Sequence, residues 1–314
     1  MIGIESHHFT PTPIQLQDDA VHPPKMFGNV ETWYYDAILS NSYSMACVVN
    51  VMRFLNTGLV LSGVFLYKDT ILLKWVRTRT LLTHFQGSHE RPQLILHGKI
   101  IIDAKPSQNP KEWTYHVSLG DEKNNIELDF LKNREGWRGT HVIGDWLVAP
   151  RLTVTGTLTM EGTTVNVTGI GYHDHNNYPL FSPFFAKEAN FGKIIAGPIT
   201  AVWGQVIRKN NQADNMLVIN TDGTLQSLAS NDIQLRVKEF IEDRGKRVTK
   251  KYGLHVLTQG VSIDVDIESL NYHYLTIPGV KYWRHHARNI GTITVGSHSE
   301  KVEDLGIIDQ LTFL

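Results

Sequence analysis

The chain has 314 residues, and its 30 basic and 31 acidic residues leave a net charge of −1, which excludes the basic excess typical of nucleic-acid or anionic-membrane binding. A single cysteine, Cys47, excludes an intramolecular disulfide and a zinc site built from several cysteines. The sequence offers no signal-peptide pattern and no apolar run of about 18 residues, so we expect a cytoplasmic protein with no integral membrane segment.

Strands dominate the predicted elements of the first half. Residues 1–27 read as an extended lead-in, and Cys47 lies in an apolar run that predicts a buried thiol. The predicted strands share β-branched and aromatic residues; they are 32–36, 45–54, 60–67, 70–75, 94–102, 113–119, 126–131, 152–160 and 163–170. Glu161-Gly162 predicts a two-residue hairpin turn between the last two.

The second half continues in the same style. Its predicted strands are short and β-branched; they are 199–208, 215–220, 233–241, 253–257, 261–267, 291–296 and 306–313. Asp222-Gly223 is a hairpin signal, and the alternation within 230–250 favours paired strands over a helix. Only 182–190 offers one or two helical turns.

Strand spacing of about 10 to 15 residues predicts a sandwich or barrel. Prolines and glycines cluster between residues 180 and 197 and indicate a domain boundary there. We therefore expect an all-β protein with an N-terminal domain over 28–185 and a C-terminal domain over 186–314.

The densest group of chemically active side chains follows the predicted strand 163–170. Gly171 precedes Tyr172, His173, Asp174, His175 and Asn176. Because side chains alternate along a strand, Tyr172, Asp174 and Asn176 share one face, and His173 and His175 share the other. Either face carries groups suited to proton transfer.

Aromatic side chains stand out at three other places, two of them beside charges. Trp33 and Tyr35 share a strand face next to Asp36, Trp203 follows an apolar run, and Trp283 precedes Arg284. Such pairs line apolar pockets that hold small molecules. No phosphate-binding loop, GxSxG elbow, HExxH or CxxC pair accompanies them, so ATP, NAD and serine-hydrolase chemistry have no local support.

Together these motifs resemble the AttH/CrtC-like superfamily, which includes carotenoid 1,2-hydratases and is similar in architecture to fungal lipocalin-like Diels–Alderases and tocopherol cyclases. The resemblance rests on Trp33 to Asp36, Gly171 to Asn176, Trp203, Tyr282-Trp283 and Gly306 to Asp309, and it runs from about residue 28 to the C-terminus. It implies two consecutive antiparallel lipocalin-like β-barrel domains, a hydrophobic small-molecule substrate, and chemistry that uses no redox or nucleotide cofactor.

A hydratase or cyclase of this type acts at C=C bonds of an isoprenoid or polyketide-like substrate. We expect Asp174 to be the acid, with His175 orienting it or activating water and Tyr172 assisting. The other predicted site residues bind substrate or shelter a cation; they are Trp33, Tyr35, Asp36, His173, Asn176, Trp203 and Trp283.

Two other classes of function stay open. The first is a metal enzyme, because His173 and His175 share a strand face and His84, His89 or His116 offers a third ligand. The second is a non-catalytic carrier of a lipid or terpenoid, which needs only the barrel and its rings.

Overall fold

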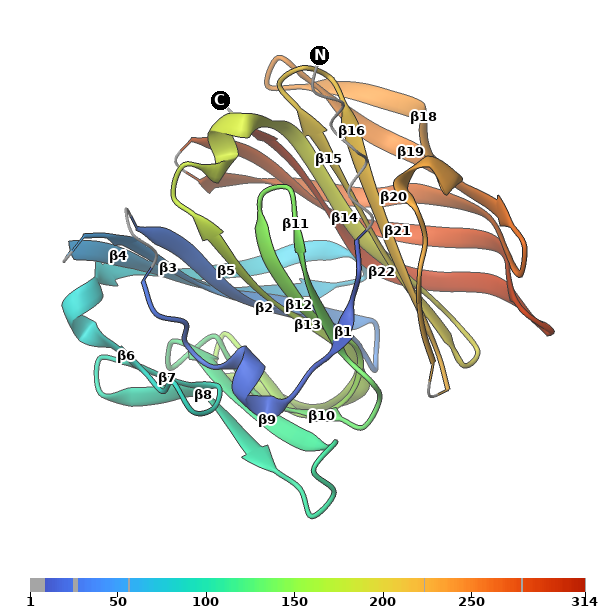
Figure 1. The fold of residues 1–314 in the computed structure, drawn as a ribbon. Coiled ribbons are helices and arrows are strands. Elements are labelled where there is room, and N and C mark those ends of the chain that lie inside the picture. The colour runs from blue at the N-terminus through green and yellow to red at the C-terminus, as the bar shows by residue number, and fades with distance from the viewer. Residues whose placement is uncertain (1–8, 25–27, 56, 223, 278, 314) are drawn as a thin grey trace. The chain divides into compact units, whose positions relative to one another are not determined.

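The chain folds into two antiparallel β-sheets. The computed structural model describes residues 9–24, 28–55, 57–222, 224–277 and 279–313 (Figure 1). Among these residues the only helices are four short 3-10 turns, and the rest of the regular structure is strand. The all-β fold class predicted from the sequence is confirmed, with two β-barrel-type domains.

The first unit spans Thr12–Ser182. Its elements are β1 Thr12–Pro13, η1 Leu16–Asp19, β2 Asn29–Leu39, β3 Tyr43–Phe54, β4 Thr57–Lys68, β5 Ile71–Leu81, η2 Leu82–His84, β6 Phe85–Gly87, β7 Gln93–Leu96, β8 Lys99–Pro106, β9 Trp113–Gly120, β10 Asn125–Lys132, β11 Trp137–His141, β12 Gly144–Met160 and β13 Thr163–Pro179.

The order of strands in this sheet brings the start and the end of the unit together. The sheet runs β5-β4-β3-β2-β13-β12-β10-β9-β8-β7-β6, so β2 pairs with its hairpin neighbour β3 on one side and with β13 on the other. The sheet curls into a nearly closed barrel around an apolar core (Figure 1). The β2–β13 pair therefore places residues about 140 positions apart side by side.

The second unit begins at Pro183, and residues 9–11 group with it. After η3 Ser182–Phe185 its elements are β14 Ala186–Ala196, β15 Ile199–Arg208, β16 Ala213–Thr221, β17 Thr224–Ser227, η4 Ser230–Asp232, β18 Ile233–Asp243, β19 Lys246–Thr258, β20 Val261–Ile277, β21 Val280–Val295 and β22 His298–Phe313. Its first long strand, β14, again pairs with its last, β22. Buried apolar side chains of this unit form a core separate from that of the first unit.

Most local predictions agree with these elements. Glu161 and Gly162 join β12 to β13 with φ of 50° and 81°, the positive values that a type I′ turn requires. Within 230–250, strands β18 and β19 pair as expected. Thr221 pairs with Thr224 around the expected Asp222-Gly223 turn, although Gly223 lies outside the described residues.

Two segments differ from the sequence prediction. The turns expected over 182–190 reduce to η3, because the chain from Ala186 pairs with β15 and satisfies its backbone in a ladder instead. The lead-in is not merely extended: β1 pairs with β11, and η1 follows it, so residues 12–22 belong to the first unit. Cys47 is a buried free thiol, as expected.

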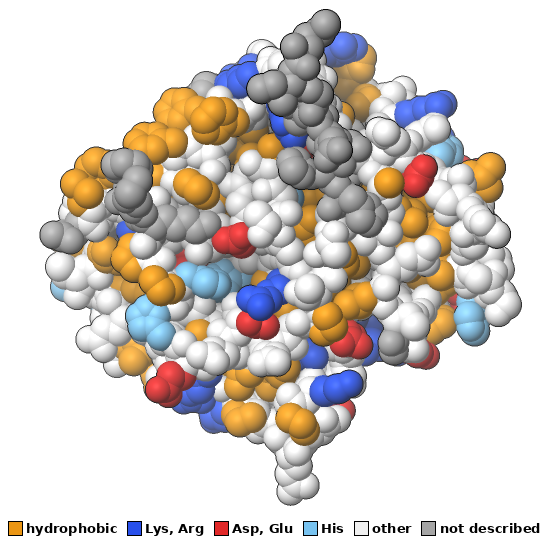
Figure 2. Space-filling view, viewed as in Figure 1, with side chains coloured by type: hydrophobic (Ala, Val, Ile, Leu, Met, Phe, Trp, Pro, Cys, Tyr) orange, Lys and Arg blue, Asp and Glu red, His pale blue; other side chains and the backbone are white. Residues whose placement is uncertain are grey.

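The surface carries charges of both signs. On the face drawn in Figure 2, basic and acidic side chains are interspersed among hydrophobic and neutral ones. This mixing fits the net charge of −1. None of the helices in the described residues has the length and apolar character needed to cross a membrane.

Candidate functional site

The β2–β13 pair builds the site by strand alternation. His173 lies opposite Tyr35 and His175 lies opposite Trp33 in the register. All four side chains point into the first barrel, where Trp33 and Tyr35 are fully buried in its core. The predicted separation of faces is confirmed, and the face with the two histidines is the interior one.

Each interior histidine stacks on one aromatic ring. The His173 ring lies 4.1 Å from the Tyr35 ring at an interplanar angle of 16°, and the His175 ring lies 4.3 Å from the Trp33 ring at 25°. The indole Nε1 of Trp33 donates to the carbonyl of Asp19 at 3.2 Å. This packing fixes the ring orientations.

The N-terminal segment supplies the first acid. Asp19 ends η1 and is fully buried, with Oδ2 lying 2.9 Å from Nε2 of His173. Its Oδ1 lies 3.0 Å from Nδ1 of His175, which is within ion-pair distance. The two atoms are not hydrogen-bonded, because the N–H does not point at the oxygen. Since Nδ1 of His173 faces the carbonyl of Tyr34 at 2.8 Å, that nitrogen must be the donor.

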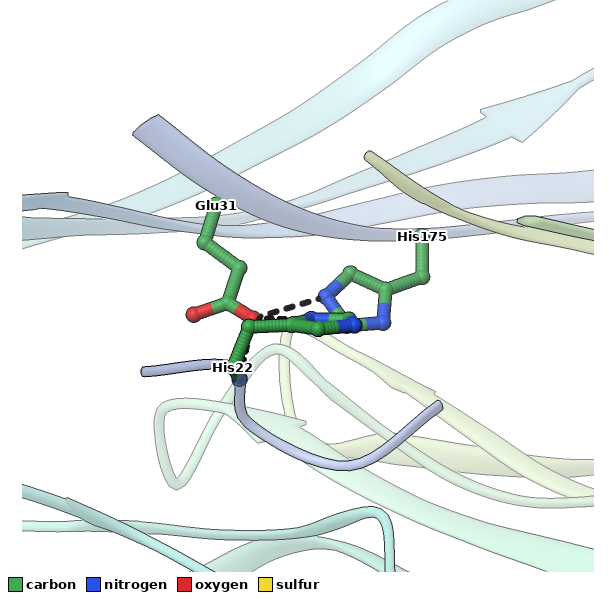
Figure 3. A group of neighbouring side chains, drawn as sticks. All are labelled: His22, Glu31 and His175. Carbon is green, nitrogen blue, oxygen red and sulfur yellow. Dashed lines mark hydrogen bonds and ion pairs between the residues drawn. The ribbon is translucent and has the colours of Figure 1, made fainter. Parts of the chain in front are cut away.

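Glu31 is the second acid and lies on the same face of β2 as Trp33. Its Oε1 accepts from three groups: the His22 backbone N–H at 2.8 Å, His22 Nδ1 at 2.9 Å and His175 Nε2 at 3.1 Å (Figure 3). Its Oε2 accepts from Arg53 at 2.7 Å. Two buried carboxylates, Asp19 and Glu31, are thus balanced by Arg53 and a protonated His175.

The pKa shifts agree with that balance. Burial alone would lower the pKa of His175, but its contacts with Asp19 and Glu31 outweigh burial and raise the pKa to about 9. Burial alone would raise the pKa of each carboxyl, but the histidines hold the pKa of Asp19 and of Glu31 well below the usual range. Asp19, Glu31 and His175 are therefore ionised near neutral pH.

His22 connects the buried network with a cavity at the surface. Its side chain is 36% exposed, whereas those of Glu31 and His175 are 0% and 1% exposed. A cavity of about 510 Å³ is lined by Gln17, Asp18, Ala20, Val21, His22, Pro23, Pro24, His89 and Arg138. A neighbouring cavity of about 240 Å³ shares His22 and His89 and adds Arg53 and Phe85. Imidazoles and carboxylates thus alternate from this opening inward: His22, Glu31, His175, Asp19, His173.

The predicted acid Asp174 lies on the opposite face of β13. Its carboxylate accepts from the Tyr172 hydroxyl at 2.9 Å and from the Asn176 amide at 2.8 Å, and Asp36 accepts from Tyr34 on the neighbouring strand at 3.2 Å. Burial, reinforced by Asp174, raises the pKa of Tyr172 well above its usual range. The structure therefore does not bring Asp174 together with His175, because adjacent residues of a strand point to opposite faces.

The two remaining predicted aromatic residues belong to the second unit. Trp203 is buried in that unit's core, and Trp283 is buried with its Nε1 donating to Asp243 at 2.7 Å. They are therefore not members of the cluster in the first barrel.

The histidines expected as a third metal ligand do not accompany the interior pair. His84 stacks on His97, and His116 lies at the surface beside Asp129 and Glu127. His89 faces the carbonyl of Val21 at 2.6 Å. The histidine that does approach His175 is His22, with ring centroids 5.0 Å apart.

Sequence reasoning missed Asp19, His22, Glu31 and Arg53. Glu31 had a readable signal, since it alternates with Trp33 and Tyr35 along one strand face. Asp19 and His22 had none, because only the folded path of the lead-in brings them to the barrel.

Several solved structures have an architecture similar to that of this chain. The sequence matches no protein-family model and no curated protein. An AttH-assigned protein from Nitrosomonas europaea is similar in structure at a TM-score of 0.66 and 12% identity, covering 93% of this chain and 97% of that one. The chain has the AttH-like fold.

Two further solved structures share this fold. CghA, solved with Sch210972, matches at a TM-score of 0.63 and 12% identity over 96% of this chain and 98% of CghA. Kievitone hydratase from Nectria haematococca matches at 0.59 and 10% identity over 96% and 92%. At these identities the likeness shows the fold alone, and it agrees with the fold that the sequence resemblance implies.

Proposed function

We propose that the chain is an enzyme that transfers protons at C=C bonds of a hydrophobic isoprenoid or polyketide-like substrate, in a hydration, cyclisation or isomerisation. The observation that carries the proposal is the series of alternating imidazoles and carboxylates that begins at the cavity-lining His22. A hydratase and a protein solved with Sch210972 share the fold, which supports this class of chemistry.

His22 is the group that meets the substrate in this proposal. Glu31 accepts from Nδ1 of His22, which orients the ring and leaves Nε2 to exchange a proton with the substrate. Arg53 and His175 hold Glu31 in its ionised form, so the carboxylate stabilises the imidazolium that forms on His22. Such proton transfers need no redox or nucleotide cofactor.

Asp174 and Tyr172 form the second candidate for proton transfer. Both oxygens of Asp174 accept hydrogen bonds, one of them from Tyr172, and this arrangement favours the carboxylate over the neutral acid. Asp174 would then act as a base rather than as the acid expected from the sequence, with Asn176 orienting it.

Solvent deuterium provides the test. The protein is incubated in D₂O with a panel of polyene isoprenoids and polyketide-like polyenes, and products are analysed by mass spectrometry for carbon-bound deuterium. We expect incorporation, and we expect His22→Gln to slow it by about 10²–10⁴-fold, the usual contribution of a general acid or base. Asp174→Asn tests the second candidate in the same assay.

His116→Gln is the matched control, because His116 is also half-exposed and also contacts a carboxylate, Asp129, at 2.9 Å. It should retain full activity. Turnover without deuterium would contradict proton transfer to carbon, and unchanged turnover in His22→Gln would remove His22 from the chemistry. Binding of the panel without any turnover would favour the carrier instead.

A further inference from the structure

Three ligand-type atoms converge beside the cavity that His22 lines. His22 Nδ1 and His175 Nε2 lie 2.9 Å and 3.1 Å from the same oxygen of Glu31, and the ligand atoms of the three residues all lie within 4.8 Å of one another. Figure 3 shows both imidazole rings directed at that carboxylate oxygen from opposite ends of the first unit's sequence.

These spacings are close to those of a metal site. Zinc binds imidazole nitrogen and carboxylate oxygen at about 2.0–2.2 Å, which puts neighbouring ligand atoms of a tetrahedron about 3.3–3.5 Å apart. The present separations of 2.9 Å and 3.1 Å are a few tenths of an ångström shorter, so small side-chain rotations open the site. Two histidines and one carboxylate are a common ligand set for Zn²⁺ and Fe²⁺.

The surroundings orient the three ligands as metal sites do. Arg53 occupies Oε2 of Glu31 and leaves Oε1 to face the imidazoles. The second nitrogen of His175 lies 3.0 Å from Oδ1 of Asp19 without a hydrogen bond, so a small rotation of the ring separates this pair from the carboxylate–histidine hydrogen bond that accompanies most metal-bound histidines. Trp33 stacks on the same ring and fixes its plane.

We propose that His22, Glu31 and His175 bind a divalent transition-metal ion, with Zn²⁺ as the fitting choice, and that its remaining coordination positions open toward the cavity beside His22. The carboxylates of Asp19 and Glu31 both lie against His175, and their negative charge favours a cation here. Binding exchanges the ion for the protons on the two ligand nitrogens. This inference rests on the proposed function only for the position of the reaction, which lies beside His22. With the ion bound, Nδ1 of His22 contacts the ion instead of Glu31.

Metal binding is measured on the full chain without substrate. The protein is stripped with a chelator and titrated with Zn²⁺ in competition with a chromophoric chelator, and then with Co²⁺, whose visible absorption reports its coordination. We expect one ion per chain and a Co²⁺ spectrum of low coordination number. His22→Gln should weaken binding by about 100-fold or more, and Asp19→Asn by about 10–100-fold, the range for a group behind the ligands.

His116→Gln is again the matched control. His116 also contacts two carboxylates, Glu127 and Asp129, but this group lies at the surface of the barrel, so the variant should bind the ion as the wild type does. His22 is partly exposed, and circular dichroism of His22→Gln checks that the barrel is folded before its affinity is compared. Failure of the wild-type chain to bind one Zn²⁺, or unchanged affinity in His22→Gln, would overturn the metal site. Deuterium incorporation by chelator-treated protein that binds no Zn²⁺ would overturn the metal site alone and leave the proposed function standing.

Discussion

His175 in the first barrel and His285 in the second sheet are both buried residues of antiparallel strands, yet one is charged and the other is neutral near neutral pH. His175 lies between two carboxylates, and its pKa is raised to about 9. Burial, with His286 nearby, lowers the pKa of His285 to about 3. The same residue type is therefore an ionised partner in one unit and a neutral core residue in the other.

The difference comes from the partners that each fold brings to its histidine. His285 lies opposite Ile308 of the second core; its Nδ1 pairs with the Ser269 hydroxyl at 2.9 Å, and its Nε2 is buried without a hydrogen-bond partner among the described residues. A hydroxyl cannot compensate a buried positive charge, whereas Asp19 and Glu31 can. Burial of a histidine alone therefore does not mark a site; burial with acids does.

Removal of one acid from the first network should have the largest effect. In metal-free protein, Glu31→Gln leaves Arg53 and His175 buried without their shared anion, so we expect a loss of about 3–5 kcal/mol in the free energy of unfolding. Urea unfolding measures the loss, and hydrogen exchange of the β2 and β13 amides locates it. Glu127→Gln removes an exposed acid beside His116 and should cost less than about 0.5 kcal/mol. Equal effects of the two substitutions would mean that the buried network does not stabilise the barrel.

Alkaline pH should weaken the first unit through His175. Because its folded pKa of about 9 lies above the ordinary histidine pKa of 6.5, the folded state binds more protons between these values, and stability falls as pH rises through that window. Its contribution is complete below pH 6.5 and reaches at most about 3 kcal/mol. Urea unfolding of metal-free protein at pH 6.5, 7.5 and 9 measures this loss. The contribution of His175 is the slope of unfolding free energy against pH in the wild type minus the same slope in His175→Gln. Equal slopes in the two proteins would show that His175 is not protonated in the folded state.

The interior of this site shows what the sequence could and could not predict. Val165 and Val167 alternate with Thr164 and Asn166, so odd positions of β13 face the core, and the same alternation extends inward to the two histidines. The sequence pattern therefore predicts which face of β13 points into the core. The turn residues predict where strands end and hairpins form. Asp19 reaches His173 across 154 positions, and no local period encodes a contact of that length. By the same alternation Asp174, at an even position, faces away from the core.

Acid should weaken the second unit through its neutral histidines, with a smaller effect for each group. Because the folded pKa of His285 lies below the ordinary histidine pKa of 6.5, the unfolded chain binds more protons between pH 6.5 and 3, and stability falls as pH falls through that window. Between pH 6.5 and 5 this amounts to about 2 kcal/mol at most for one group. His273 and His286 shift in the same direction, so His285→Leu should remove only its own share of the slope.

The carboxylates of the first network do not interfere in this pH range, because Asp19 and Glu31 lose their stabilising charge only as pH falls below their ordinary pKa values of 3.8 and 4.5. Urea unfolding of wild type and His285→Leu at pH 6.5, 5.75 and 5 measures the difference, and hydrogen exchange of the β20, β21 and β22 amides assigns it to the second sheet. We expect the variant to be at least as stable as wild type at pH 5, because an apolar side chain carries no charging cost in that core. A wild-type acid slope that His285→Leu leaves unchanged would mean that His285 finds a partner for its proton in the folded protein. The contrast with His175 would then be lost.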